Sequence, residues 1–250
     1  MIYVCVTARD NAPTVGLVLW KIRQVFEDFP REYHLLVADD ASTDGTAAVL
    51  APYERALPMS LIRTDRPRGY AACLEHLLRR ALELTDRPKR DCVATLPADF
   101  SVSPAVLPDL IRRLESGADL VVGEAALDTI PLMQRLVRRA APWLLKPGLR
   151  LSGFRDVMSG AYAVRLVTLK ACIRECAGSL LGTEGRCADA ELVARAAAAA
   201  RQISVAPITT TTPYAPALRR DGPLALALQL MRAGRSLSVP APQAPLQRSS

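Results

Sequence analysis

The sequence predicts an α/β fold, a doubly wound and mostly parallel sheet with helices on both faces. Short apolar runs alternate with amphipathic stretches along the first half of the chain, which is the pattern of repeated strand–helix units. The chain has 250 residues, half of them apolar, and is therefore long enough for one sizeable core. Acidic residues follow several of the apolar runs, where the loops of such a sheet carry ligand sites.

The predicted elements follow one another in a regular order. The strands are short apolar runs bounded by turn residues, and the helices carry apolar residues three and four positions apart, as at Leu74, Leu77, Leu78 and Ala81. In chain order we expect a strand at 2–7, a helix at 14–26, a strand at 34–38, a helix at 46–55, a strand at 59–63, a helix at 69–84, a strand at 92–96, a helix at 107–115 and a strand at 120–123.

The end of the chain has a different composition. Residues 223–237 indicate one last amphipathic helix. Residues 239–250 are rich in Pro, Gln and Ser, and this composition predicts disorder. We therefore expect a single domain over residues 1–238, followed by a short disordered tail.

Composition excludes several classes of protein. Gly and Pro are not enriched enough for a fibrous or disordered chain, and no apolar run approaches the roughly 18 residues of a membrane-spanning helix. The first residues enter a strand without a charged leader, so we expect a cytoplasmic location, with a peripheral position at the inner face of the membrane as a further option. The six cysteines form no C-x-x-C pair, which predicts buried thiols rather than a zinc site or a disulfide framework.

Charge is unevenly distributed along the chain. The net charge of +7 divides into −3 for residues 1–125 and +10 for residues 126–250. An acidic first half can hold a metal or accept hydrogen bonds from a nucleotide, and a basic second half favours phosphates or an anionic lipid surface. Aromatic residues make up only 5% of the chain and do not alternate with the basic ones, so we expect no nucleic-acid partner.

Carboxylates follow three of the predicted strands. Asp10 comes after the first strand, Asp39 and Asp40 after the second, and Asp99 after the fourth. Taken alone, Asp10 fits a turn, and Asp44 fits a helix cap. The pair Asp39 and Asp40 is different, because two adjacent negative charges at the end of a buried strand are unfavourable unless a donor or a cation meets them. This pair therefore predicts a binding site at the carboxyl edge of the sheet.

Seven segments, taken in order, carry a family resemblance. DDASTDGT at 39–46 is similar to a nucleotide-binding signature, and LPADFS at 96–101 is similar to a metal-binding Asp-x-Asp segment. Together with residues 6–11, 68–72, 156–162, 189–192 and 205–208, they resemble the family 2 glycosyltransferases. These are inverting enzymes of the GT-A fold and include the dolichyl-phosphate and polyprenyl-phosphate sugar synthases. The resemblance implies the GT-A fold and a transferase.

The resemblance also implies roles for individual residues toward a nucleoside diphosphate sugar. The implied nucleotide-binding residues are Thr7, Asp10, Asp39, Asp40, Arg68 and Asp99, with Asp40 accepting a hydrogen bond from the ring N–H of the base. Asp99 would also help to hold a divalent cation, Mg²⁺ or Mn²⁺, on the diphosphate. The implied acceptor-side residues are Ser159, Gly160, Arg219 and Arg220, and the implied general base for a hydroxyl acceptor is Asp189, with Glu191 as second choice.

Three positions depart from the family pattern. Pro97 replaces the first carboxylate of the Asp-x-Asp segment, and Asn11 replaces the Glu of the opening Asn-Glu pair. The arginine that polyprenyl-phosphate enzymes carry after their late strand is absent, because residues 209–212 are all Thr. Each departure removes a charged group from the site, so the sequence leaves open whether a metal is required.

Residues 129–155 contain no acidic residue, and basic and apolar side chains alternate along them. A basic amphipathic helix of this kind can lie in the interface of an anionic bilayer. An ordinary surface helix, or a face for protein association, accounts for the pattern equally well. A membrane surface is therefore one of three interpretations of this stretch.

The acceptor is open at the level of sequence. A polyprenyl phosphate is the first expectation, and a soluble small molecule is the second. Pro97 and Asn11 favour a rival interpretation, a non-catalytic protein that keeps the fold and binds a nucleotide or a partner protein. A nucleotidyltransferase is a third option, but its usual Gly-rich loop after the first strand is missing.

Overall fold

The structure is a computed structural model. It describes residues 1–125, 136, 140, 141, 143–145, 153–176, 178–210, 223–236, 239 and 246–248. Most of the acid-free stretch 129–155, as well as Arg219 and Arg220, therefore lies outside the described residues.

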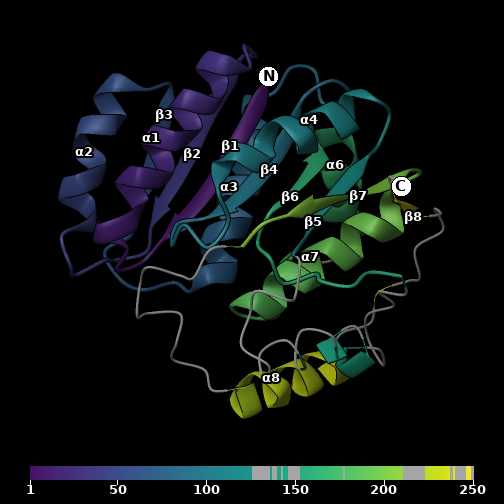
Figure 1. The fold of residues 1–250 in the computed structure, drawn as a ribbon. Helices are drawn as coiled ribbons and strands as arrows, with labels where there is room; N and C mark the ends of the chain where they lie inside the picture. The colour runs from purple at the N-terminus through teal and green to yellow at the C-terminus, as the bar shows by residue number, and fades with distance from the viewer. Residues whose placement is uncertain are drawn as a thin grey trace.

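A mixed sheet forms the centre of the molecule (Figure 1). Its strands are β1 (Ile2–Ala8), β2 (Tyr33–Asp39), β3 (Met59–Arg63), β4 (Cys92–Pro97), β5 (Leu120–Ala125), β6 (Tyr162–Arg165), β7 (Ile203–Ile208) and β8 (Leu246–Arg248). The order across the sheet is β3-β2-β1-β4-β6-β5-β7-β8. Every neighbouring pair is parallel except the two that involve β6, which runs antiparallel to β4 and β5.

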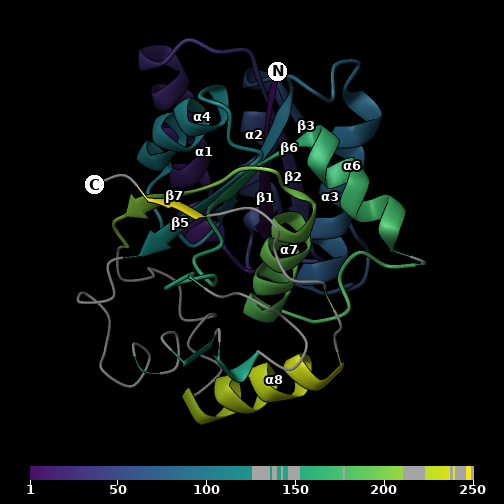
Figure 2. The same ribbon diagram turned by 90° about the vertical axis from the view of Figure 1, so that its right-hand side faces the viewer.

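Helices cover both faces of this sheet (Figure 2). The helical elements are α1 (Ala12–Asp28), α2 (Thr46–Ala56), α3 (Tyr70–Leu84), η1 (Pro104–Val106), α4 (Leu107–Glu115), α6 (Leu166–Glu175), α7 (Arg186–Ala199) and α8 (Pro223–Ser236). Helices α1, α2 and α4 pack on one face, and α3, α6 and α7 pack on the other. Helix α8 contacts α7.

Strands β1 to β7 supply alternate side chains to two hydrophobic cores. In β1, Val4 and Val6 face the core under α1 and α4, whereas Tyr3 and Cys5 face the core under α3 and α7. This alternation is the two-residue period of a strand that is buried on both faces. The predicted α/β fold is confirmed, and the five strands expected before residue 126 all occur.

Two strands differ from the sequence-based expectations. Strand β6 was not predicted, because it has only four residues and follows a loop rather than a helix. Residues Leu246–Arg248 lie in the tail that we expected to be disordered, yet they pair with β7 as an edge strand. The outer edge of β7 offers unpaired backbone N–H and C=O groups, which a short extended segment can satisfy.

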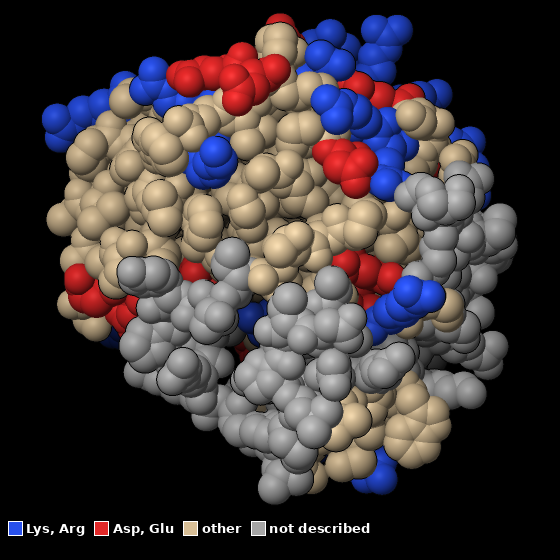
Figure 3. All heavy atoms as spheres, viewed as in Figure 1, with Lys and Arg blue, Asp and Glu red and all other residues tan. Residues whose placement is uncertain are grey.

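The face seen in Figure 3 has a central area with few charged side chains, and acidic and basic patches lie along its upper edge. Leu17 and Trp20 of α1 are each 46% exposed. All six cysteines are free, as expected, and only Cys176 is not buried. Among the described residues, the structure contains no helix that combines the length and apolarity needed to cross a membrane.

Candidate functional site

A cavity of about 330 Å³ lies at the carboxyl ends of β1 and β4. Ligands bind at this edge in open α/β sheets. Six parts of the chain meet around it: the turn after β1, the end of β2, the start of α3, the turn after β4, the segment before β6 and the start of α7. The lining residues are Thr7, Ala8, Arg9, Asp10, Asn11, Asp40, Tyr70, Cys73, Pro97, Ala98, Asp99, Gly160, Gly185, Arg186 and Asp189.

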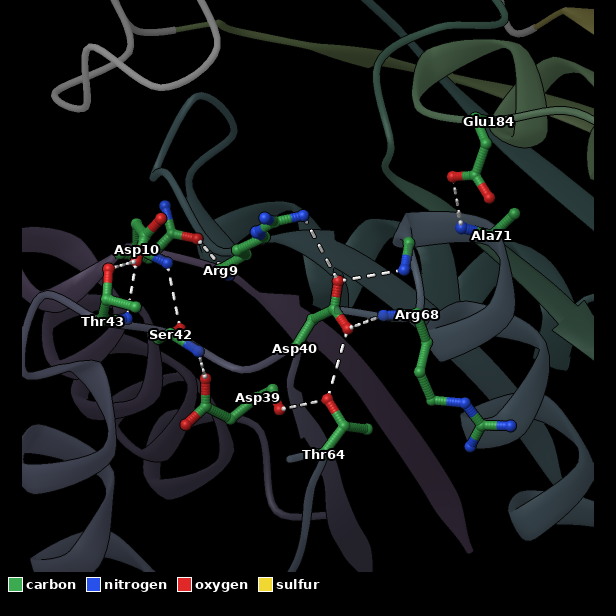
Figure 4. Close-up of polar contacts among 12 residues, drawn as sticks. Arg9, Asp10, Asp39, Asp40, Ser42, Thr43, Thr64, Arg68, Ala71 and Glu184 are labelled. Atoms are coloured by element: carbon green, nitrogen blue, oxygen red, sulfur yellow. Dashed lines mark hydrogen bonds and ion pairs between the residues drawn. The ribbon is translucent and has the colours of Figure 1, made fainter. Parts of the chain in front are cut away.

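The turns around the cavity have an unusual backbone. Asp10, Ala41 and Phe100 follow β1, β2 and β4, and their φ angles are 53°, 52° and 58°. Residues with a Cβ rarely adopt this left-handed conformation, and such residues cluster at functional sites. The first two turns support each other, because Asp10 Oδ1 accepts hydrogen bonds from the Thr43 N–H (2.8 Å) and the Thr43 hydroxyl (Figure 4).

The adjacent carboxylates Asp39 and Asp40 have different surroundings. Asp40 lines the cavity, and its oxygens accept hydrogen bonds from the backbone N–H of Arg68 (2.6 Å) and of Gly69 (3.1 Å) (Figure 4). Asp39 accepts a hydrogen bond from the Ser42 N–H (3.2 Å) and does not line the cavity. The donors predicted for this pair therefore include backbone amides of the protein itself.

Arg68 contributes its backbone to the site rather than its charge. The guanidinium of Arg68 is exposed and points away from Asp40 (Figure 4). Arg9 supplies the nearest cation instead, with its NH1 atom 3.9 Å from Asp40 Oδ2. Arg9 lines the cavity and was not predicted.

Asp99 has one oxygen without a partner. The residue is 1% exposed, and its Oδ1 accepts a hydrogen bond from the Ser101 N–H (2.9 Å). No group among the described residues hydrogen-bonds its Oδ2. A buried carboxylate oxygen without a partner is unfavourable in the free protein and calls for a cation or a donor from a ligand.

This oxygen fits a divalent cation that takes most of its ligands from elsewhere. Hard cations such as Mg²⁺ prefer carboxylate, phosphate and water oxygens. The described residues contain no group of three or more His, Cys, Asp or Glu that could hold a metal by themselves. Pro97, which stands where the family pattern has the first carboxylate of its Asp-x-Asp segment, lines the cavity and cannot ligate through its side chain. A cation at Asp99 would therefore depend on phosphate and water oxygens.

Asp189 is buried in the first turn of α7, on the other side of the cavity. Its Oδ1 accepts hydrogen bonds from the hydroxyl of Tyr70 (2.7 Å) and the hydroxyl of Tyr162 (3.3 Å). Burial raises the pKa of Asp189 to about 6, although the hydrogen bond from Tyr70 and the charge of Arg186 act in the opposite direction. A carboxylate with a pKa in this range suits general base chemistry near neutral pH.

Glu191 lies outside the cavity. It is fully buried, and its Oε2 accepts hydrogen bonds from the backbone N–H of Gly182 (2.9 Å) and of Thr183 (3.0 Å). Its Oε1 pairs with Arg195 at 2.7 Å, and Glu191 does not line the cavity. Its carboxylate holds the loop before α7, so the structure assigns it a structural contact in place of the second-choice base role.

The acceptor-side residues are only partly brought together. Gly160 lines the cavity with a φ of 74°, whereas the Ser159 hydroxyl accepts a hydrogen bond from the Ala161 N–H (3.2 Å) and does not line it. Arg219 and Arg220 are outside the described residues. Arg186 lines the cavity and was not predicted; its side chain donates to the Met158 carbonyl (2.7 Å). The only feature of the sequence that could have pointed to Arg186 is its position three residues before the family segment at 189–192.

A sequence model of the family described as Glycosyl transferase family 2 matches residues 3–148, more than half of the chain. A dolichol-phosphate mannosyltransferase from Pyrococcus furiosus is 23% identical over 139 residues, which cover 53% of this chain and 38% of that protein. The chain thus spans less than half the length of this curated relative.

Solved structures share the fold. Glucosyl-3-phosphoglycerate synthase from Mycobacterium tuberculosis, in complex with Mn²⁺, UDP-glucose and phosphoglyceric acid, has a TM-score of 0.64 at 18% identity, with 96% of this chain and 80% of that chain covered. TarS from S. aureus, in complex with UDP-GlcNAc, has a TM-score of 0.56 at 17% identity and coverages of 84% and 59%. The chain belongs to glycosyl transferase family 2 and has the GT-A fold.

Proposed function

We propose that this chain transfers a sugar from a nucleoside diphosphate donor to an acceptor, with inversion at the anomeric carbon. One observation carries the proposal: two buried carboxylates, Asp99 and Asp189, line a single cavity, and each keeps an oxygen that accepts no hydrogen bond from the described residues. A scaffold has no need for two such groups, because leaving an oxygen of a buried carboxylate without a partner is unfavourable.

The turns after β1 and β2 form the donor side. Thr7, Asp10 and Asp40 line the cavity there and offer oxygen atoms to the donor groups of a base and a ribose. Asp99 would hold a divalent cation, which would neutralise the diphosphate and make it a better leaving group. The Mycobacterium tuberculosis synthase has been crystallised with Mn²⁺ and UDP-glucose and with Mn²⁺ and UDP, which supports this arrangement.

Asp189 forms the acceptor side. As the acceptor oxygen attacks the anomeric carbon, Asp189 takes the proton from the acceptor hydroxyl. The new carbon–oxygen bond forms as the bond to the diphosphate oxygen breaks, and that oxygen keeps the electron pair. Attack from the face opposite the leaving group inverts the anomeric centre.

Two acceptor classes have support from relatives. The Pyrococcus furiosus relative is a dolichol-phosphate mannosyltransferase, which favours a polyprenyl phosphate met at a membrane surface. The Mycobacterium tuberculosis structure contains phosphoglyceric acid, which favours a small soluble acceptor. The buried, partly unpartnered Asp189 favours a hydroxyl acceptor, since a phosphate is already ionised at neutral pH and needs no base.

The test measures donor binding and donor turnover separately. UDP, GDP and their glucose and mannose conjugates are titrated calorimetrically with Mn²⁺ or with EDTA, and release of the nucleoside diphosphate is then followed with polyprenyl phosphate in anionic vesicles or with 3-phosphoglycerate. Binding of one nucleotide family, with release that depends on an acceptor, is the expected result. Failure of all nucleotides to bind would overturn the proposal, and binding without release of product would favour the non-catalytic alternative.

A further inference from the structure

Tyr70 is placed to control the carboxylate of Asp189. It is the first residue of α3, lines the cavity and donates its hydroxyl to Asp189 Oδ1 at 2.7 Å. Burial and the nearby charge of Asp189 raise the pKa of Tyr70 well above its usual value. The phenol therefore stays protonated at any working pH and acts as a permanent donor.

The second tyrosine donates to the same oxygen. Tyr162, in β6, lies with its hydroxyl 3.3 Å from Asp189 Oδ1. With both donors on Oδ1, Oδ2 accepts no hydrogen bond from the described residues. A Cβ built on Gly160 would lie 3.7 Å from Oδ2 and 3.8 Å from Pro97 Cδ. Because Gly160 has no side chain, a small open space remains between Gly160 and Pro97, and Asp189 Oδ2 borders this space.

The backbone around Tyr70 is fixed from two directions. The N–H groups of Arg68 and Gly69 donate to Asp40, and the Ala71 N–H donates to Glu184 Oε2 (3.3 Å) (Figure 4). Four consecutive residues, 68–71, thus contact the donor-side carboxylate, the acceptor-side carboxylate and the loop before α7. The position of the Tyr70 hydroxyl is therefore set by the same contacts that hold Asp40.

We propose that Tyr70 is a positioning residue for sugar transfer, which holds Asp189 Oδ1 so that Oδ2 faces the acceptor hydroxyl in the space beside Gly160. The inference rests on the proposed function, because it assigns a role to Tyr70 in that reaction. Tyr162 supports the same geometry through a longer hydrogen bond. The acceptor is accordingly an alcohol.

The proposal predicts the direction of a pH shift. The titratable and charged groups that face Asp189 are Tyr70 from α3, Tyr162 from β6, Arg186 from α7 and Asp156 from the segment before β6. The hydrogen bond from Tyr70 stabilises the charged carboxylate and lowers its pKa, so its removal raises that pKa. A base must be deprotonated, and the acid limb of the activity profile should therefore move to higher pH.

The experiment reads the carboxylate directly and needs no substrate. The full chain is labelled with [¹³Cγ]aspartate, and the signal that disappears in Asp189→Asn is titrated in the wild type, Tyr70→Phe and Tyr162→Phe. We expect the midpoint to rise by about one pH unit in Tyr70→Phe, the equivalent of one hydrogen bond to a charged group, and by less in Tyr162→Phe. Tyr53→Phe, a change on α2, is the matched control and should leave the midpoint unchanged.

A second measurement separates positioning from structure. Transfer from UDP-glucose or GDP-mannose, whichever binds, should slow in Tyr70→Phe, while the Kd for that donor and the melting temperature stay within about twofold and a few degrees of the wild type. An unchanged ¹³C midpoint in Tyr70→Phe, or a shifted midpoint with unchanged transfer at every pH, would overturn the role of Tyr70. If instead no nucleotide binds the wild type, the proposed function fails, whatever the carboxylate titration shows.

Discussion

The two sides of the cavity use carboxylates in different ways. On the side of β1 and β2, Asp10 and Asp40 accept hydrogen bonds from backbone N–H groups of other loops and so hold those loops together. On the side of β4 and α7, Asp99 and Asp189 each keep one oxygen that accepts no hydrogen bond from the described residues. The first pair therefore holds the loops of the donor side in place as well as lining the cavity, whereas each carboxylate of the second pair has one oxygen left for a ligand.

This difference separates stability from function. Replacing a carboxylate that accepts backbone N–H groups leaves buried donors unsatisfied, which lowers the free energy of unfolding. Replacing one that is buried and partly unpartnered removes an unfavourable charge and should leave the fold intact. Substitutions on the two sides should therefore have opposite effects on the free energy of unfolding.

The largest effect is expected for Asp189→Asn. The amide keeps an oxygen for the two tyrosine hydroxyls but cannot take a proton, so transfer should fall by about 10² to 10⁴-fold, the range for a general base. Calorimetry should show an unchanged donor Kd. Glu191→Gln is the control, because Glu191 does not line the cavity. A larger loss of transfer in Glu191→Gln than in Asp189→Asn would mean that Glu191, and not Asp189, is the general base.

The same substitution should stabilise the protein above pH 6. The folded chain keeps a proton on Asp189 up to about pH 6, whereas the unfolded chain releases it near 3.8. The protonated carboxyl group therefore stabilises the fold at low pH. As pH rises from 3.8 to about 6, the free energy of unfolding falls by about 2 to 3 kcal/mol in total. Urea unfolding of Asp189→Asn should give a higher free energy than the wild type at pH 8 and an equal one below pH 4; equal values at both pH values would contradict the raised pKa.

Asp40→Asn should weaken the fold by about 2 kcal/mol, because one amide N–H group would then face the Arg68 and Gly69 N–H donors. Chemical denaturation measures this, with Asp65→Asn, an exposed change nearby, as the control. An unchanged free energy of unfolding would mean that the backbone contacts of Asp40 do not stabilise the chain, and the contrast between the two sides would be lost.

Asp99→Asn should have the opposite pattern. The affinity for a nucleoside diphosphate in Mn²⁺ should fall about tenfold, equivalent to one charge-assisted contact, and should no longer respond to EDTA. The melting temperature should stay the same or rise, because an unpaired buried charge is removed. Wild-type affinity that ignores EDTA would show that no cation is needed at Asp99.

The smallest effect is expected for Gly160→Ala. The φ of 74° disfavours a Cβ by about 1 kcal/mol, and this Cβ would occupy the space beside Asp189 Oδ2. Transfer should therefore decrease more than donor affinity. Gly45→Ala, whose φ is 91° and whose added Cβ would contact nothing within 4 Å, controls for backbone strain alone.

Sequence patterns predicted the fold because apolar periodicity is local. The helix 107–115 and the strand 59–63 were predicted to the residue. The family segments also selected six residues that line the cavity: Thr7, Asp10, Asp40, Asp99, Gly160 and Asp189. Their chemical roles are predictions, which the substitutions above test.

The partners of these residues could not be predicted, because they come from distant parts of the chain. Tyr70 and Asp189 are 119 positions apart, and no pattern in the sequence links a phenol at one helix start to a carboxylate at another. Helix geometry alone could have distinguished the two candidate bases. Residues two positions apart on a helix face different directions, so Asp189 and Glu191 could not both face the same cavity.

The six free thiols have a practical consequence for spectroscopy. Burial raises the pKa of Cys73, Cys92 and Cys172 to about 12, and Cys176 is the only partly exposed cysteine of the six. A maleimide dye should therefore attach to the native chain at one place, just beyond the last residue of α6. A fluorescent reporter could therefore be attached at a single site without any cysteine being added or removed.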